Sequence, residues 1–268
     1  VAIGAPFNDG NGSDSGHVRV FQYSGTTWTQ LGQDINGEFS DDYSGSAVSL
    51  SDDGLTVAIG ANWNDGNGNR SGHVRIFQYN GAIWTQIGQD LDGDAPFDNN
   101  GYSVKLSSDG LIVATGATGG DGNGNGSGRT RVYQLNGNTW NQIGQDINGE
   151  TAGDSSGYSL SLSDDGTILA IGAPNNGGNG INSGHVRVYK INQNVWSLLS
   201  PDIDGENPGD RSGTSVSLSA DGTNLAIGAE TNSDSANGSG HVRVYDLSAL
   251  LSVKEQNELP YCIHLSQE

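Results

Sequence analysis

A loop rich in Asn, Asp and Gly recurs along the chain and offers oxygen ligands for a metal ion. Its copies begin at Asn8-Asp9-Gly10-Asn11, Asn64-Asp65-Gly66-Asn67 and Gly120-Asp121-Gly122-Asn123, and the pattern weakens at Gly177 and Ser233. Ca²⁺ takes roughly six to eight oxygen ligands, which spaced polar side chains and flexible glycines can supply. A solvated Asn/Gly turn is the structural alternative. The candidate calcium ligands are Asp9, Asn11, Asp14, Asp65, Asn67, Asp121 and Asn123.

Aromatic residues offer a second kind of chemistry, the stacking of a ligand on a ring. Phe7 and Trp63 occupy one position of the loop, whereas the later copies hold Gly119, Asn175 and Thr231. An aromatic face beside polar groups is a common ligand platform, so we interpret Phe7 and Trp63 as exposed ligand contacts. A separate Trp column could stack on sugars or pack between repeats, and we favour packing; its members are Trp28, Trp84, Trp140 and Trp196.

Acidic residues form a second recurring set, with three carboxylates at similar spacing in each copy. Asp caps turns and backbone N–H groups well, and we favour that interpretation over cation binding. The four copies are Asp34, Glu38, Asp42; Asp90, Asp94, Asp98; Asp146, Glu150, Asp154; and Asp202, Glu206, Asp210.

A histidine and an arginine stand two residues apart on one expected strand, so their side chains are expected on the same face of that strand. A catalytic or metal-binding role for the histidines is one hypothesis. Each histidine belongs to a different copy and the third copy has Arg129 instead, so we favour a structural role. The arginines are then expected to pair with carboxylates of an adjacent strand or repeat. The columns are His17, His73, His185, His241 and Arg19, Arg75, Arg131, Arg187, Arg243.

No nucleophile elbow, zinc-protease helix or phosphate loop occurs in the sequence. Two carboxylates can hydrolyse glycosidic bonds, so a glycosidase-like enzyme is a third-ranked hypothesis. Almost every acidic residue has a counterpart one repeat away, whereas a single active site would break the symmetry. We therefore predict that the chain is not an enzyme.

The elements that position these residues follow from an exact repeat. The motif V/L-A-I/T-G-A starts at Val1, Val57, Val113, Leu169 and Leu225, each 56 residues beyond the last. A fixed period near 50 residues is typical of a propeller or a solenoid. The second copy predicts four strands, at 47–50, 57–61, 73–79 and 84–91, and Ser51-Asp52-Asp53-Gly54 predicts a tight hairpin between the first two. Solenoid repeats are shorter or partly helical, so we predict an all-β propeller of about five four-stranded antiparallel blades.

The stretch S-G-Y-S-L-S-L-S-D-D-G-T-I-L-A-I-G-A-P at 156–174 resembles the FG-GAP repeat of integrin α-subunits and bacterial surface proteins. The G-H-V-R-V-Y stretch with its downstream Trp is also similar to repeats in secreted proteins of marine Bacteroidetes. The resemblance implies a β-propeller used for adhesion or ligand binding. Two departures are notable: the hairpin lacks the family's usual D-x-D-x-D-G calcium loop, and the copy number falls short of the seven blades common in the family. The chain either closes as five blades with help from its tail or forms part of a larger array.

The expected organisation is a propeller at 1–246 and an irregular tail or linker at 247–268. The units lie at 1–35, 36–91, 92–147, 148–203 and 204–246. Within the tail, 248–254 predicts a short helix and 257–266 an edge strand. The chain starts at Val1 inside a strand-like run, and we interpret it as processed or truncated.

Composition restricts the partners. The formal net charge is −20, which disfavours nucleic acid, and no apolar run reaches membrane-spanning length. The five Trp and nine Tyr argue against disorder, and the single cysteine, Cys262, cannot form an internal disulfide. We expect an extracellular or cell-surface module that binds a protein or a cell-surface ligand. A multivalent glycan-binding lectin is the alternative, and further repeats or a second chain are expected to close the ring.

Overall fold

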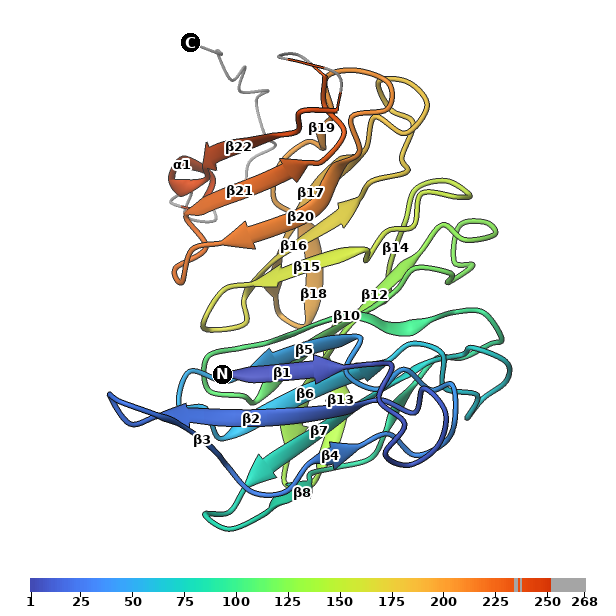
Figure 1. Ribbon diagram of the computed structural model, residues 1–268. Coiled ribbons are helices and arrows are strands. Elements are labelled where there is room, and N and C mark those ends of the chain that lie inside the picture. The colour runs from blue at the N-terminus through green and yellow to red at the C-terminus, as the bar shows by residue number, and fades with distance from the viewer. Residues whose placement is uncertain (234–235, 237, 252–268) are drawn as a thin grey trace.

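The computed structural model describes residues 1–233, 236 and 238–251, which form 22 strands in five antiparallel sheets and one short helix (Figure 1). The first sheet contains β1 (Ala2–Ala5), β2 (His17–Tyr23), β3 (Trp28–Gln30) and β4 (Ile35–Asn36). The second contains β5 (Ala47–Leu50), β6 (Thr56–Ala61), β7 (His73–Tyr79), β8 (Trp84–Gln86) and β9 (Leu91–Asp92). The third contains β10 (Asn100–Leu106), β11 (Ile112–Ala117), β12 (Arg129–Asn136), β13 (Thr139–Gln142) and β14 (Ile147–Asn148). The fourth contains β15 (Ser159–Leu162), β16 (Ile168–Ala173), β17 (His185–Asn192), β18 (Val195–Leu198) and β19 (Ile203–Asp204). The fifth contains β20 (Ser212–Leu218), β21 (Asn224–Ala229) and β22 (His241–Asp246).

The sheets confirm the predicted all-β fold of about five propeller blades. The short helix α1 (Ser248–Leu251) follows β22 and lies inside the run predicted to be helical. The predicted edge strand at 257–266 lies outside the described residues.

One strand prediction is wrong in a way that shapes the blade. The single strand expected at 84–91 is two strands, β8 and β9, and both pair with β7. The strand is interrupted near Gly88, whose φ of 74° is a left-handed conformation that glycine adopts without strain. The chain then returns so that Asp92 lies opposite His73 at the start of β7. Carboxylates just before and within β9 are thereby brought close to the histidine.

The predicted hairpin between the first two strands is confirmed. Gly54 has a φ of 73°, and the Asp53 carboxylate accepts hydrogen bonds from the Ser51 hydroxyl and the Leu55 backbone N–H. The same side-chain contacts recur at Asp109, Asp165 and Asp221. The hairpin therefore stabilises its own turn through side-chain hydrogen bonds.

The hydrophobic core lies between blades. Val18 and Val20 of β2 pack against Val57 and Ile59 of β6, and the buried Trp84 completes this cluster. Equivalent clusters join each later pair of sheets. Because a blade buries its faces only on its neighbours, stability depends on the stack.

The Trp column is confirmed as a contact between blades. The indole N–H of Trp84 donates to the carbonyl oxygen of Leu31 in the preceding blade at 2.7 Å, and Trp140 and Trp196 repeat the bond. Trp28 belongs to the first sheet and is 58% exposed, since the described chain places no blade before it.

Both ends of the stack expose apolar faces. Val242 and Val244 on β22 are 68% and 70% exposed, although their counterparts Val186 and Val188 are fully buried. Extensive strand contacts join each sheet to the next, and among the described strands none of comparable extent joins the fifth sheet to the first. Figure 1 shows β1 in the lower half and β20–β22 in the upper half.

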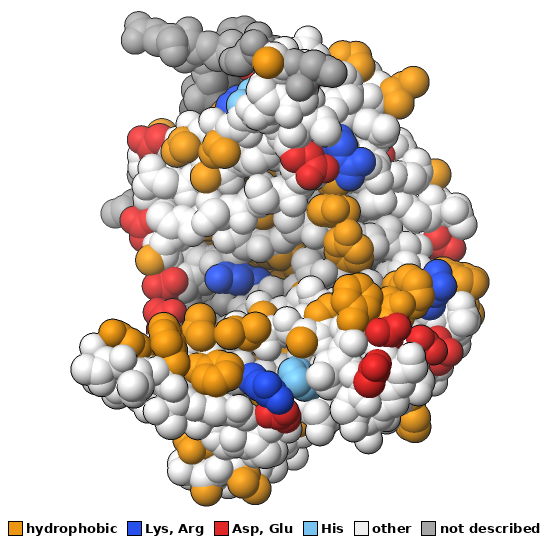
Figure 2. All heavy atoms as spheres, in the orientation of Figure 1, with side chains coloured by type: hydrophobic (Ala, Val, Ile, Leu, Met, Phe, Trp, Pro, Cys, Tyr) orange, Lys and Arg blue, Asp and Glu red, His pale blue; other side chains and the backbone are white. Residues whose placement is uncertain are grey.

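The first sheet exposes the face that, in the later blades, packs against the preceding sheet. Val1, Ile3 and Tyr23 are all more than half exposed, whereas the counterparts Val57 and Ile59 are buried. In Figure 2, hydrophobic side chains gather over the lower half of the visible surface, where Figure 1 places β1 and β2. Within the described part of the chain no helix is long and apolar enough to cross a membrane.

Candidate functional site

The structure brings the two predicted ligand contacts together through a tyrosine. Tyr43 lies between Phe7 and Trp63, with ring centroids 5.2 Å and 4.5 Å apart. The guanidinium carbon of Arg70 stands 3.6 Å from the centroid of the Trp63 ring. We call Phe7, Tyr43, Trp63 and Arg70 the aromatic patch.

Loop geometry positions the members of the aromatic patch. Phe7 follows β1 and Trp63 follows β6, which is the equivalent strand of the next blade. Tyr43 lies in the link between β4 and β5. Tyr43 and Arg70 both have left-handed backbone conformations, with φ of 55° and 53°. The Asp65 carboxylate accepts a 2.7 Å hydrogen bond from the Arg70 backbone N–H, which closes the turn that carries the guanidinium to Trp63.

The aromatic patch breaks the symmetry of the repeat. At the positions equivalent to Tyr43 and Trp63, the fourth blade has Ser155 and Asn175, joined by a 3.1 Å hydrogen bond. The sequence analysis missed Tyr43 and Arg70. Tyr43 is the one aromatic residue, and Arg70 the one cationic residue, at its position among the repeats. That departure from the repeat is the signal that could have found Tyr43.

The predicted calcium loops lie at the same end of their strands, one per blade. The Asp9 carboxylate accepts from the Asp14 backbone N–H, and Asp65 and Asp121 make equivalent bonds five residues ahead. The asparagine side chains donate to carbonyl oxygens in the following link, as Asn67 does to Gly93 at 3.0 Å. Asn11 and Asn123 repeat this bond. These contacts hold each loop in place, and calcium binding by the loops stays a prediction.

The acidic set divides into two roles. Its third member caps a turn, as the Asp42 carboxylate does by accepting from the Phe39 backbone N–H at 2.9 Å. Asp98, Asp154 and Asp210 accept equivalent bonds from the backbone N–H three residues earlier, which confirms the predicted capping role for these residues. The first two members lie beside the histidines and arginines of β7 and its counterparts. The predicted pairing across blades is confirmed by the 3.1 Å ion pair between Arg75 and Glu38.

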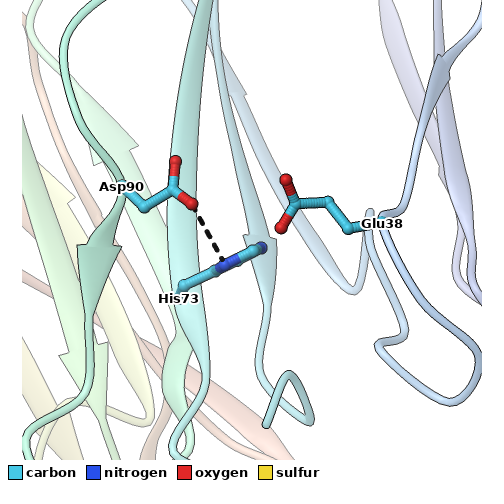
Figure 3. Close-up of side chains that lie close together, drawn as sticks. All are labelled: Glu38, His73 and Asp90. Atoms are coloured by element: carbon cyan, nitrogen blue, oxygen red, sulfur yellow. Dashed lines mark ion pairs between the residues drawn. The ribbon is translucent and has the colours of Figure 1, made fainter. Parts of the chain in front are cut away.

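Among the residues that the structure describes, two clusters contain a histidine close to two carboxylates. In the first, Glu38 comes from the link before β5, His73 begins β7 and Asp90 precedes β9 (Figure 3). Their nearest ligand atoms lie within 4.8 Å of one another, and His73 Nδ1 is 3.8 Å from the Asp90 carboxylate. The second cluster is Glu150, His185 and Asp202. Groups able to hold a metal ion are therefore present, but at positions outside the predicted calcium loops.

Electrostatics within the first cluster show crowded negative charge around a neutral imidazole. Burial and the neighbouring Arg75 lower the pKa of His73 to about 4, so the imidazole is neutral near pH 7. Burial raises the pKa of Asp92, and the charges of Asp90 and Glu38 raise it further.

Comparison with solved structures supports the assignment of the chain to the β-propeller class of fold. The chain is similar to the hydrazine synthase of Kuenenia stuttgartiensis, with 14% identity over 87% of this chain and 57% of that one, and a TM-score of 0.56. It is also similar to a protein from Bacteroides uniformis ATCC 8492 described as a 6-phosphogluconolactonase, with 15% identity over 86% of this chain and 63% of that one, and a TM-score of 0.51. This chain thus spans less than two thirds of either protein, and the likeness shows the fold alone.

The particular repeat is identified by a family model. Residues 37–77 match the FG-GAP repeat, which confirms the resemblance noted in the sequence. The matched segment covers β5, β6 and most of β7, and the same motif recurs with the 56-residue period. No curated protein matches the chain.

Proposed function

We propose that this chain is a non-catalytic binding module of the cell exterior or cell surface, and that its aromatic patch contacts a protein ligand. The observation that carries the proposal is the patch itself, because it interrupts an otherwise regular repeat. A stack of similar blades offers similar surfaces, so the place where the blades differ is where one ligand can be selected.

The composition of the aromatic patch favours a protein over a sugar. Trp, Tyr and Arg are enriched among the residues that contribute most to protein–protein binding. Trp63 already contacts both Tyr43 and Arg70, so little of its ring is left for a sugar to stack on. The Arg70 guanidinium adds a charged group that suits an acidic side chain of a partner.

A glycan-binding lectin is the second candidate because Phe7 is 70% exposed and could stack on a sugar ring. A lectin built on repeats would gain avidity from several equivalent sites. The aromatic patch has its complete set of residues only across the first two blades, which favours a single binding surface.

The test is solid-phase binding to a panel of purified extracellular proteins, each presented before and after enzymatic deglycosylation. We expect the chain to bind at least one panel member in both forms. The double variant Phe7→Ser and Trp63→Ser should weaken that binding at least tenfold. Asn175→Ser, at the equivalent position of the fourth blade, serves as the matched control and should bind as the unchanged protein does.

Two outcomes would contradict the protein-ligand proposal. Binding that disappears on deglycosylation would support the lectin instead. Binding that persists equally in the Phe7 and Trp63 double variant would show that the aromatic patch is not the contact surface.

We also propose that the Asn/Asp/Gly loops bind Ca²⁺ weakly. Asp9 and Asp65 are exposed at the ends of their loops, and each loop carries asparagine oxygens nearby. A ligand that binds only the folded state raises the melting temperature. We expect CaCl₂ to raise the midpoint relative to EDTA, and the triple variant Asp9→Asn, Asp65→Asn and Asp121→Asn to remove the increase. An unchanged midpoint in the unchanged protein would contradict calcium binding.

The apolar ends of the stack support a proposal about partners. Val242 and Val244 are the counterparts of Val18 and Val20, on which Val57 and Ile59 pack inside the stack. Val1 and Ile3 are the counterparts of Val57 and Ile59, and both pairs at the ends of the stack are exposed. Large exposed apolar patches mark interaction sites. We propose that the last sheet of one copy packs on the first sheet of another, head to tail.

Mixing variants tests this arrangement. Val242→Asp with Val244→Asp blocks one face, and Val1→Asp with Ile3→Asp blocks the other. We expect concentration-dependent association of the unchanged chain in light scattering, monomers for each variant alone, and a heterodimer when the two variants are mixed. A monomeric mixture, or a dimer of either variant by itself, would contradict head-to-tail pairing.

A further inference from the structure

His185 is a buried side chain whose two ring nitrogens have no hydrogen-bond partner. The side chain is 1% exposed, and both Nδ1 and Nε2 are buried without a donor or acceptor in reach. Buried polar atoms are normally hydrogen-bonded, because an unsatisfied one loses its hydration without compensation. Here Nδ1 is directed at two carboxylates, Glu150 and Asp202, each 3.7 Å away.

These separations are close to those of ligands on one metal ion. Imidazole nitrogen and carboxylate oxygen bind Zn²⁺ at about 2.0–2.2 Å, so two ligands of a tetrahedral ion lie roughly 3.4 Å apart. The two distances from His185 Nδ1 exceed that value by only about 0.3 Å, and the ligand atoms of all three residues lie within 4.8 Å of one another. The carboxylates remain partly exposed, at 43% for Glu150 and 23% for Asp202, which leaves a path for an ion from solvent.

The third blade shows that the same position accepts a positive charge. There Arg129 replaces the histidine, and its guanidinium nitrogens lie 3.0 Å from Asp94 and 2.7 Å from Asp98. Arg131 also bridges Asp94 and Asp146, the counterparts of Glu150 and Asp202, at 2.6 Å and 2.8 Å. In the fourth blade the equivalent arginine, Arg187, lies 3.9 Å from Glu150. Arg131 therefore lies closer to Asp94 and Asp146 than Arg187 lies to Glu150, so the carboxylates beside His185 are less well neutralised by arginine.

We propose that Glu150, His185 and Asp202 bind a divalent transition-metal ion such as Zn²⁺. Glu38, His73 and Asp90 form a second, weaker copy of this site, because Arg75 already lies 3.1 Å from Glu38. A histidine ligand favours zinc over calcium, which binds through oxygen. Each site joins the link that follows one sheet to two segments of the next blade. The ion would thus tie neighbouring blades together, as Arg129 and Arg131 do in the third blade.

Calorimetric titration with ZnCl₂ tests the two sites after the protein has been treated with a chelator. The tail also contains Cys262 and His264, which bind zinc in many proteins, so all measurements use the background Cys262→Ser with His264→Ala. We expect saturable binding of two ions per chain. His73→Ala and His185→Ala should each remove one, and the double variant should remove both.

Two further variants separate metal binding from loss of fold. His185→Arg reproduces the residue of the third blade, and should lose one ion while keeping its circular dichroism spectrum and a cooperative melt. His17→Ala changes a histidine outside both clusters and should still bind two ions. Zinc should raise the melting temperature of the unchanged protein and raise it less in His185→Arg.

The proposal would be overturned by the absence of saturable zinc binding in the unchanged chain. It would also be overturned by an ion count that stays at two in the folded His185→Arg variant. Loss of one ion in His17→Ala would place the metal elsewhere and contradict the assignment equally.

Discussion

At the scale of single residues, the same side chain has different consequences in different blades. Trp140 is buried and donates its indole N–H to the carbonyl oxygen of Ile87, whereas Trp28 is exposed and its ring lies 5.0 Å from that of Tyr23 in its own sheet. Position within the stack, more than residue type, decides how much each contributes to stability.

Replacing Trp140 by Ala should lower the free energy of unfolding by about 3–5 kcal/mol, the usual cost of emptying a large buried aromatic site. Trp28→Ala, the matched change in the first blade, should cost less than about 1 kcal/mol because its surface is already in water. Urea denaturation followed by circular dichroism measures both. Equal losses in the two variants would contradict the burial argument.

Acid should weaken the third blade through its arginine pairs. Hydrogen bonds from Arg131 lower the pKa of Asp94 and Asp146 below the usual carboxyl value. A carboxylate with a lowered folded-state pKa stabilises the fold above its unfolded pKa, near 4, and loses this contribution as the pH falls through the folded value. We expect Asp146→Asn to flatten the decline of the melting temperature between about pH 5 and pH 2. Asp41→Asn, at an exposed turn position, should leave the decline unchanged, and parallel curves for all three proteins would contradict the effect.

At the scale of elements, the closest approach between blades depends on glycine. Gly60 on β6 lies against the backbone carbonyl of Gly101 on β10, so closely that a Cβ atom would overlap it. The same contact recurs between Gly116 and Gly157. The glycine of the Ile-Gly-Ala motif therefore sets the distance between adjacent sheets.

Gly60→Ala should destabilise the chain by about 1–3 kcal/mol or more, because backbone must move to admit the methyl group. Gly177→Ala is the control, since its nearest neighbour lies 3.8 Å from the added atom and its backbone is not left-handed. Chemical denaturation of both variants measures the difference. A Gly60→Ala variant as stable as the control would show that the sheets are not held this closely.

At the scale of the whole molecule, the net charge of −20 works against compactness. Like charges repel over a range of about 10 Å at 0.1 M salt, so added salt screens the repulsion. We expect the melting temperature to rise when NaCl increases from about 0.01 M to about 0.3 M. A falling midpoint would mean that attractive pairs such as Arg131 with Asp94 outweigh the general repulsion.

The sequence by itself determined the architecture of the blade. The 56-residue period, the Asp-Gly turns and the alternating apolar residues act locally, so they predict strands and hairpins without any knowledge of the stack. The Trp column and the pairing of Arg75 with a carboxylate were predicted as kinds of contact between blades because both residues recur with the repeat, but their partners were not named. The split at Gly88 was missed because one glycine does not by itself show that the chain turns back to β7.

Only the tertiary structure decided which residues of different blades meet. Tyr43 joins Phe7 to Trp63, and Glu38 reaches His73, because the sheets stack at a particular distance and rotation that no local pattern specifies. The acidic set was interpreted as turn caps, which is correct for Asp42 but leaves out the cluster around His73. The exposed ends likewise follow from the stack: Val242 repeats Val186 in sequence, and only the absence of a neighbouring blade beside it in the described chain distinguishes the two.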